Sequence, residues 1–179
     1  MNDKSDQQND HDKKRLTVIQ VVLSGIMAAL VVVATILLQF PNPATRGYTN
    51  VGDIMVFVSA LTFGPIVGGI AGSVGSALAD IISGYGIYAP FTFIIKGAEG
   101  TITGLISNQK QIWRDALAVT IAGVEMIVGY LLIEYFALGL GVAAFAEIPG
   151  NISQIVVGAA VGIPIALVLR RTIPITWRI

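Results

Sequence analysis

The apolar residues of this chain gather into six blocks separated by short polar stretches. The blocks cover roughly residues 16–38, 53–63, 65–83, 90–107, 114–138 and 149–170. A helix needs about 20 residues, within a range of about 17–25, to cross the core of a bilayer. All blocks except residues 53–63 reach this length, so the pattern predicts an all-α membrane protein with a bundle of six transmembrane helices. A five-crossing alternative, with residues 53–63 re-entrant inside the bundle, stays open.

The positions of the basic residues predict how this bundle is oriented. With six crossings, nine of them fall on one side: Lys4, Lys13, Lys14, Arg15, Lys110, Arg114, Arg170, Arg171 and Arg178. Only Arg46 falls on the other side, and Lys96 lies within a block. Because lysine and arginine collect in cytoplasmic loops, both termini are predicted to be cytoplasmic. Five crossings would place the C-terminal arginines outside, which the same rule disfavours.

Composition supports an integral membrane protein with several spans. The 179 residues are 54% hydrophobic and only 12% charged, whereas soluble domains carry about 25% charged residues. The chain has no cysteine, and its one histidine, His11, lies in a polar tail, which leaves no catalytic triad, metal site or bound cofactor to predict. Residues 1–15 are predicted to be a disordered cytoplasmic tail. Residues 16–179 are predicted to form a single bundle.

Lys96 and Glu99 stand inside the otherwise apolar block 90–107. Each charge at membrane depth costs roughly 2.5–3.5 kcal/mol on insertion scales, and such charges usually mark a binding site or a permeation path. The three-residue spacing places both side chains on one helix face, where they partly offset each other. A structural ion pair between helices is the alternative interpretation.

Further polar residues map to the same outer half of the predicted bundle. The candidate binding residues are Tyr48, Asn50, Lys96, Glu99, Glu125, Tyr130, Asn151 and Gln154. Amides, phenols, carboxylates and one ammonium in an outward cavity suit a small, polar, heteroaromatic ligand. An ion-conducting pore would need polar lining in both halves, and the inner half is apolar. The chain also lacks a phosphate-binding Gly-x-x-x-x-Gly-Lys loop, so active transport would need an ion gradient or another protein.

Three stretches of the chain resemble the substrate-binding S component of energy-coupling factor (ECF) vitamin transporters. They are GYTNVGDIMVFVSALTFGPIVGGIAGSVGSALADIISGY, YAPFTFIIKGAEGTITGLI and IPGNISQIVVGAAVG, and the resemblance covers about residues 16–170. The group in question is associated with riboflavin, hydroxymethylpyrimidine or pyridoxine. The resemblance implies a six-helix fold and an outward site formed by the loop after helix one and by helices four to six. It also implies a membrane T component and two cytoplasmic ATPases as partners, with toppling of the S component during transport.

The same resemblance assigns roles to residues. The candidate binding residues named above would hold the ligand, with Tyr48 and Asn50 in a lid. The small residues on helix one that dock the T component would be Ser24 with Ala28, or Gly25 with Ala29. No tryptophan lies near the predicted pocket, which favours a hydroxymethylpyrimidine or pyridoxine type of ligand over a large flavin.

Three other functions are weighed against vitamin uptake by an S component. A stand-alone proton-coupled transporter would use Glu125 or Asp80 as its proton carrier. A membrane enzyme is disfavoured because no nucleophile–base pair or metal-ligand cluster is visible. A purely structural subunit would use its polar residues only to join helices.

Overall fold

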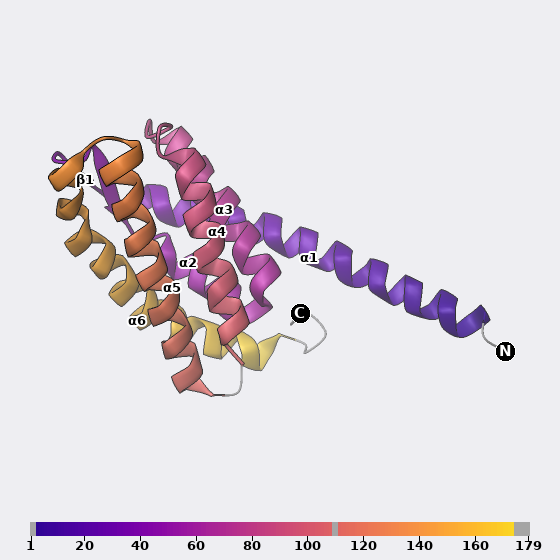
Figure 1. Cartoon of the computed structure of the whole chain (residues 1–179). Helices are drawn as coiled ribbons and strands as arrows, with labels where there is room; N and C mark the ends of the chain where they lie inside the picture. The colour runs from indigo at the N-terminus through magenta and orange to yellow at the C-terminus, as the bar shows by residue number, and fades with distance from the viewer. Residues whose placement is uncertain (1–2, 109–110, 174–179) are drawn as a thin grey trace.

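The computed structural model describes residues 3–108 and 111–173, and most of them are helical (Figure 1). The elements in order are α1 (Asp3–Leu37), β1 (Gln39–Asn42), β2 (Gly47–Asn50), α2 (Asp53–Phe63), α3 (Pro65–Ile82), α4 (Ala89–Ile106), α5 (Ile112–Leu132), the π-helical turn η1 (Ile133–Ala137), the 3₁₀ helix η2 (Gly141–Glu147) and α6 (Ile148–Thr172). The six α-helices correspond to the six predicted blocks, although α1 begins earlier, at Asp3.

Four segments of the described chain are long and apolar enough to cross a membrane. They are Val18–Leu37, Pro65–Ile82, Ile112–Ala137 and Gly141–Thr172. The helix α4 has 18 residues, but its charged pair Lys96 and Glu99 lowers its apolar character. The helix α2 has only 11 residues, and at about 1.5 Å per residue it covers roughly half of a bilayer core.

The short helix α2 lies at the centre of the bundle and packs against α1, α3, α4 and α6. A helix that is apolar all round is typical of a buried position. Phe57 and Leu61 are fully buried in a cluster with Val119 of α5 and Ala166 of α6. Gly64, with φ of 93°, ends α2 in a conformation that favours glycine, and α3 begins at the next residue.

Glycines bring α3 and α4 into backbone contact. A Cβ atom at Gly100 would lie 2.2 Å from the carbonyl oxygen of Gly68, and one at Gly72 would lie 2.3 Å from the carbonyl oxygen of Lys96. Side chains at these positions would force the two helices apart. The small-residue spacing therefore sets the distance between α3 and the part of α4 that carries Lys96.

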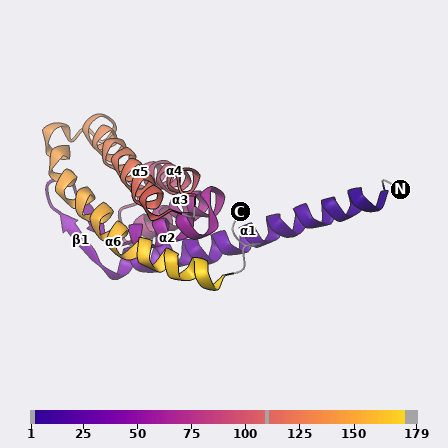
Figure 2. The same ribbon diagram turned by 90° about the horizontal axis from the view of Figure 1, so that it is seen from below.

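The helix α1 begins with the polar N-terminal segment, and its later, apolar part packs along α3. Both views show this first part of α1 projecting beyond the other helices (Figure 1 and Figure 2). A polar helix without a packing partner is marginally stable in water, so the disorder expected for residues 1–15 stays a prediction. Residues 1 and 2 lie outside the described part of the chain.

The two candidate docking pairs on α1 lie on different faces. Ser24 and Ala28 are buried, and the carbonyl oxygen of Ala28 lies 2.7 Å from where a Cβ atom at Gly75 of α3 would be. Gly25 and Ala29 are exposed, and no atom lies within 4 Å of the Cβ position of Gly25. Of these two pairs, only Gly25 and Ala29 are therefore open to contact with another helix.

The stretch between α1 and α2, expected as an external loop, contains a β-hairpin. The strands β1 and β2 pair antiparallel, with Gln39 opposite Asn50. Arg46 closes the turn in the left-handed region, with φ of 58°. The hairpin lies at the same end of the bundle as the connection between α5 and α6 (Figure 1).

Candidate ligand-binding site

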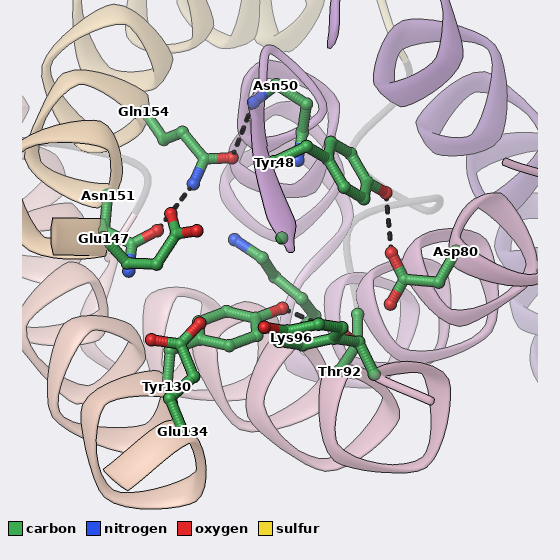
Figure 3. A pocket seen from close by; sticks show the side chains of 12 residues that line it. Tyr48, Asn50, Asp80, Thr92, Lys96, Tyr130, Glu134, Glu147, Asn151 and Gln154 are labelled. Atoms are coloured by element: carbon green, nitrogen blue, oxygen red, sulfur yellow. Dashed lines mark hydrogen bonds between the residues drawn. The ribbon is translucent and has the colours of Figure 1, made fainter. Parts of the chain in front are cut away.

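A polar cavity lies under the hairpin, between the ends of α3 to α6 (Figure 3). It is lined by Gly47, Tyr48, Asn50, Asp80, Tyr88, Thr92, Lys96, Tyr130, Glu134, Glu147, Asn151 and Gln154. The cavity volume is about 30 Å³, far below the roughly 300–1,000 Å³ typical of small-molecule sites. Polar side chains from seven elements thus meet around a small space.

Lys96 lies at the base of this cavity, and its positive charge is balanced by two carboxylates. Its ammonium nitrogen donates to Oδ1 of Asp53 at 2.5 Å and to Oε2 of Glu99 at 2.9 Å, and all three side chains are nearly inaccessible to solvent. Asp53 begins α2, so this ion-paired group joins the central helix to α4. Oδ2 of Asp53 and Oε1 of Glu99 have no hydrogen-bond partner among the described residues.

The first turns of α6 form one wall of the cavity. The side-chain amide of Gln154 donates to Oδ1 of Asn151 at 2.9 Å, as the three-residue spacing predicts. The oxygen of the same Gln154 amide accepts from the backbone N–H of Asn50 at 3.3 Å. Gln154 thereby connects α6 to the hairpin (Figure 3).

Tyr48 and Asp80 form the opposite wall. The Tyr48 hydroxyl donates to Oδ1 of Asp80 at 2.6 Å, and its ring stacks at an angle on Tyr85 with centroids 4.4 Å apart. Burial and the neighbouring Asp80 carboxylate raise the pKa of Tyr48 above its usual range. The phenol therefore keeps its proton and acts as a donor.

Tyr130 and Thr92 complete the floor beside Lys96. The Tyr130 hydroxyl donates to the Thr92 hydroxyl at 3.1 Å. The Lys96 ammonium lies 6.0 Å from the centre of the Tyr130 ring, at the outer limit of a cation–π contact. An aromatic face thus lies next to hydrogen-bonding groups, an arrangement that can hold a polar ring.

Two carboxyl groups close the cavity beneath the hairpin turn. Glu147 of η2 accepts a hydrogen bond from the Thr45 hydroxyl, and the Thr45 carbonyl accepts one from Tyr88 at 2.8 Å. Glu134 of η1 is 2% exposed, and its Oε2 has no hydrogen-bond partner among the described residues. Burial and the nearby carboxylates of Glu134 and Glu147 raise the pKa of Tyr88.

Most of the residues predicted from the sequence come together in this cavity. Tyr48, Asn50, Lys96, Tyr130, Asn151 and Gln154 line it. Glu99 lies behind Lys96 and reaches the cavity only through that side chain. Glu125 does not line the cavity. It is partly buried on α5, and one of its oxygens has no partner among the described residues. Whether these residues bind a ligand stays a prediction.

The predicted binding residues did not include several residues that line the cavity, notably Asp80, Tyr88, Thr92, Glu134 and Glu147. They also did not include Asp53, which pairs with Lys96. Asp53 stands at the start of α2, where a carboxylate is ordinary, and Asp80 lies in the last turn of α3. Glu134 and Glu147 flank the connection between two apolar blocks, so only the packing of η1 and η2 brings them inward. Within the described residues, no group of three or more acidic or histidine side chains is placed to hold a metal ion.

The described part of the chain has four helical segments that are long and apolar enough to span a bilayer and a small polar cavity at one end of the bundle, which is the architecture of a membrane protein. The model of the ECF-type riboflavin transporter S component family matches residues 15–171. The chain belongs to this family, whose members are transport subunits.

Individual relatives agree with this assignment. An uncharacterized protein encoded in the gap 3′ region of Pyrococcus woesei is 44% identical over 144 residues, which cover 80% of this chain and 96% of the relative. The thiamine precursor transporter HmpT of Lactococcus lactis is 27% identical over 86% of this chain and 89% of its own length. A UPF0397 protein of Streptococcus pneumoniae is 28% identical over 86% of each chain.

Proposed function

We propose that this S component binds a water-soluble vitamin or vitamin precursor of the hydroxymethylpyrimidine or pyridoxine type for uptake into the cell. The observation that carries the proposal is the convergence of Lys96, Tyr130, Asn151 and Gln154 on one cavity beneath the hairpin. Amide, phenol and hydroxyl groups beside an aromatic face match the edges and the face of a small polar heteroaromatic ring. The similarity to a thiamine precursor transporter supports the same ligand class.

The ligand would enter by displacement of the hairpin. A cavity of about 30 Å³ has no room for a six-membered ring, so the covering segment has to move before binding. Tyr48 and Asn50 hold the hairpin to α3 and α6 through one hydrogen bond each. In this proposal both residues belong to a lid that closes over the bound ring.

Transport would require further subunits. The proposed arrangement has six membrane segments, both termini in the cytoplasm, and a complex in the cell membrane with a T component and two ATPases. Gly25 and Ala29 supply an exposed small-residue face on α1, on which a helix of the T component can pack closely. Glu99 and Glu125 act from behind the cavity and set the charge around Lys96.

Native mass spectrometry and calorimetry test the binding function. Protein purified from its own host in mild detergent should carry a bound small molecule, and hydroxymethylpyrimidine, pyridoxine, riboflavin and thiamine should then be titrated by calorimetry. Asn151→Ala should abolish tight binding with the fold retained, because the truncated side chain lies on the cavity wall and Gln154 keeps its bond to Asn50. Unchanged affinity in Asn151→Ala would overturn the site.

Reconstitution separates this function from stand-alone transport. Vesicles that contain only this chain should take up no ligand, with or without a proton gradient. Vesicles that also contain the T component and ATPases should take up ligand when ATP is inside. Gradient-driven uptake by the chain alone would favour a proton-coupled transporter instead.

A further inference from the structure

The cavity and the ion-paired group behind it contain more carboxyl groups than basic groups. Carboxyl groups come from five residues, namely Asp53, Asp80, Glu99, Glu134 and Glu147, and each is at most 4% exposed. The only basic residue among the lining residues is Lys96. Buried carboxylates without a nearby cation are strongly unfavourable. A bound ligand would therefore have to compensate for this excess of carboxyl groups.

Lys96 does not correct the imbalance, because its charge is already used. The ammonium already has two carboxylate partners, Asp53 at 2.5 Å and Glu99 at 2.9 Å. These two carboxylates together exceed the charge of one lysine. An acidic ligand would therefore gain little from Lys96 and would meet the remaining carboxyl groups.

The carboxyl groups on the upper walls have unused hydrogen-bonding capacity. Oε2 of Glu134 and Oδ2 of Asp80 are buried, and neither has a hydrogen-bond partner among the described residues. Both residues line the cavity, from different elements and from opposite sides (Figure 3). Buried acceptors normally have a donor, so these two oxygens indicate that a group with N–H or O–H donors completes the site.

Resting on the function proposed above, we infer that the ligand of this site is cationic: a heteroaromatic ring that carries a protonated amino or aminomethyl group. The ammonium lies against Glu134 and Glu147 beneath the hairpin turn, and a hydrogen-bond donor on the edge of the ring faces Asp80. The ring itself lies over Tyr130, next to Asn151. A neutral ligand with a hydroxyl in place of the ammonium would leave the carboxylates without a counter-charge, and therefore binds more weakly.

Two matched pairs of compounds test this inference. The first pair is 4-amino-5-aminomethyl-2-methylpyrimidine and its 5-hydroxymethyl counterpart. The second is pyridoxamine and pyridoxine. Each pair differs only by an aminomethyl group in place of a hydroxymethyl group. Calorimetry on the full chain in detergent should give at least tenfold tighter binding of the amine in the pair that binds.

Substitutions at Glu134 and Glu147 test whether these two carboxyl groups cause the preference for the amine. Glu134→Gln and Glu147→Gln keep the shape of the side chain and remove the charge, so each should reduce the preference for the amine at least tenfold. Glu134→Asp keeps the charge and should retain most of the preference. Thermal unfolding of each variant checks that the protein is folded. If the Gln variants do not fold, the ratio of the affinities for the amine and the hydroxymethyl compound, measured on the unaltered chain, tests the inference by itself.

The outcomes separate the inference from the proposed function. Equal or tighter binding of the hydroxymethyl compounds overturns the cationic ligand and leaves vitamin-precursor binding intact. Binding of riboflavin with no binding of either pair also overturns it, because riboflavin has no ammonium group. Failure of both pairs, riboflavin and thiamine to bind overturns the proposed function and the inference together. A preference for the amine that survives both Gln variants overturns the assignment to Glu134 and Glu147.

Discussion

Arg170 at the end of α6 and Asp115 in the first turn of α5 form a buried two-point ion pair at the end of the bundle opposite the cavity. The nitrogen Nη1 lies 2.6 Å from Oδ2, and Nη2 lies 3.2 Å from Oδ1. The same guanidinium donates through Nε to the carbonyl of Leu61 at 2.8 Å and through Nη2 to the Ser107 hydroxyl at 3.0 Å. One side chain thus joins the ends of α2, α4, α5 and α6.

Asp115→Asn should destabilise the bundle strongly without weakening ligand binding. The change leaves a buried guanidinium without its counter-charge, and breaking a buried pair in this way costs about 3–5 kcal/mol. Thermal unfolding in detergent should show a clearly lower midpoint, while calorimetry on folded protein at low temperature gives the same ligand affinity. Arg171→Ala is the control, because Arg171 is exposed and should leave the midpoint unchanged. An unchanged midpoint for Asp115→Asn would contradict the assigned role of the pair.

Tyr48→Phe should speed the release of the ligand. The substitution removes the 2.6 Å hydrogen bond that holds the hairpin to α3 and leaves the buried Oδ1 of Asp80 without the donor that Tyr48 supplies. Loss of such a partner costs about 1–3 kcal/mol, so the dissociation rate should rise by roughly five- to more than a hundredfold. Rapid-mixing fluorescence measures the rate. Tyr135→Phe is the matched control, because Tyr135 is partly exposed and contacts Phe136 and Phe145 by its ring.

The spacing of residues along single helices predicted two of the side-chain pairs around the cavity. The three-residue separations of Lys96 from Glu99 and of Asn151 from Gln154 place each pair on one face, and both pairs are hydrogen-bonded in the structure. Hydropathy alone also located the six α-helices. Such signals are local, because the helix repeat decides which side chains share a face.

Residues whose position depends on contacts between distant segments could not be predicted in this way. Asp53 begins a helix too short to cross the membrane, and only the enclosure of α2 by its neighbours places that carboxylate against Lys96. Glu134 and Glu147 lie in irregular helical turns between α5 and α6, where sequence periodicity carries no information on direction. The hairpin was expected as a loop because four-residue strands with two prolines nearby give a weak strand pattern.

Gly72→Ala should destabilise the protein and weaken ligand binding together. The added Cβ would lie 2.3 Å from the carbonyl oxygen of Lys96, a backbone atom that cannot move aside without shifting α4. Overpacking of this kind costs about 1–3 kcal/mol. Thermal unfolding and calorimetry should both show the loss. Gly86→Ala, at a position with no atom within 4 Å, should change neither value. Normal affinity and stability in Gly72→Ala would contradict the close contact.

Gly25→Leu should separate ligand binding from transport. The position is exposed on α1 with open space around it, so the isolated chain should keep its stability and affinity. A large side chain there prevents the close approach of a partner helix, so co-purification with the T component and ATP-driven uptake should be lost. Val124→Leu on α5, at a site 54% exposed, is the control and should assemble normally. Normal assembly of Gly25→Leu would exclude this face of α1 as the docking site.

The enclosed helix α2 extends from the base of the cavity, where Asp53 meets Lys96, to the far end, where the Leu61 carbonyl meets Arg170. Between these points Phe57 and Leu61 fill the interior with packed hydrocarbon. A polar solute could follow this axis only by displacing this buried packing. A ligand held in the cavity therefore has no polar route along α2 in the described part of the protein, and the core around α2 is the barrier to leakage.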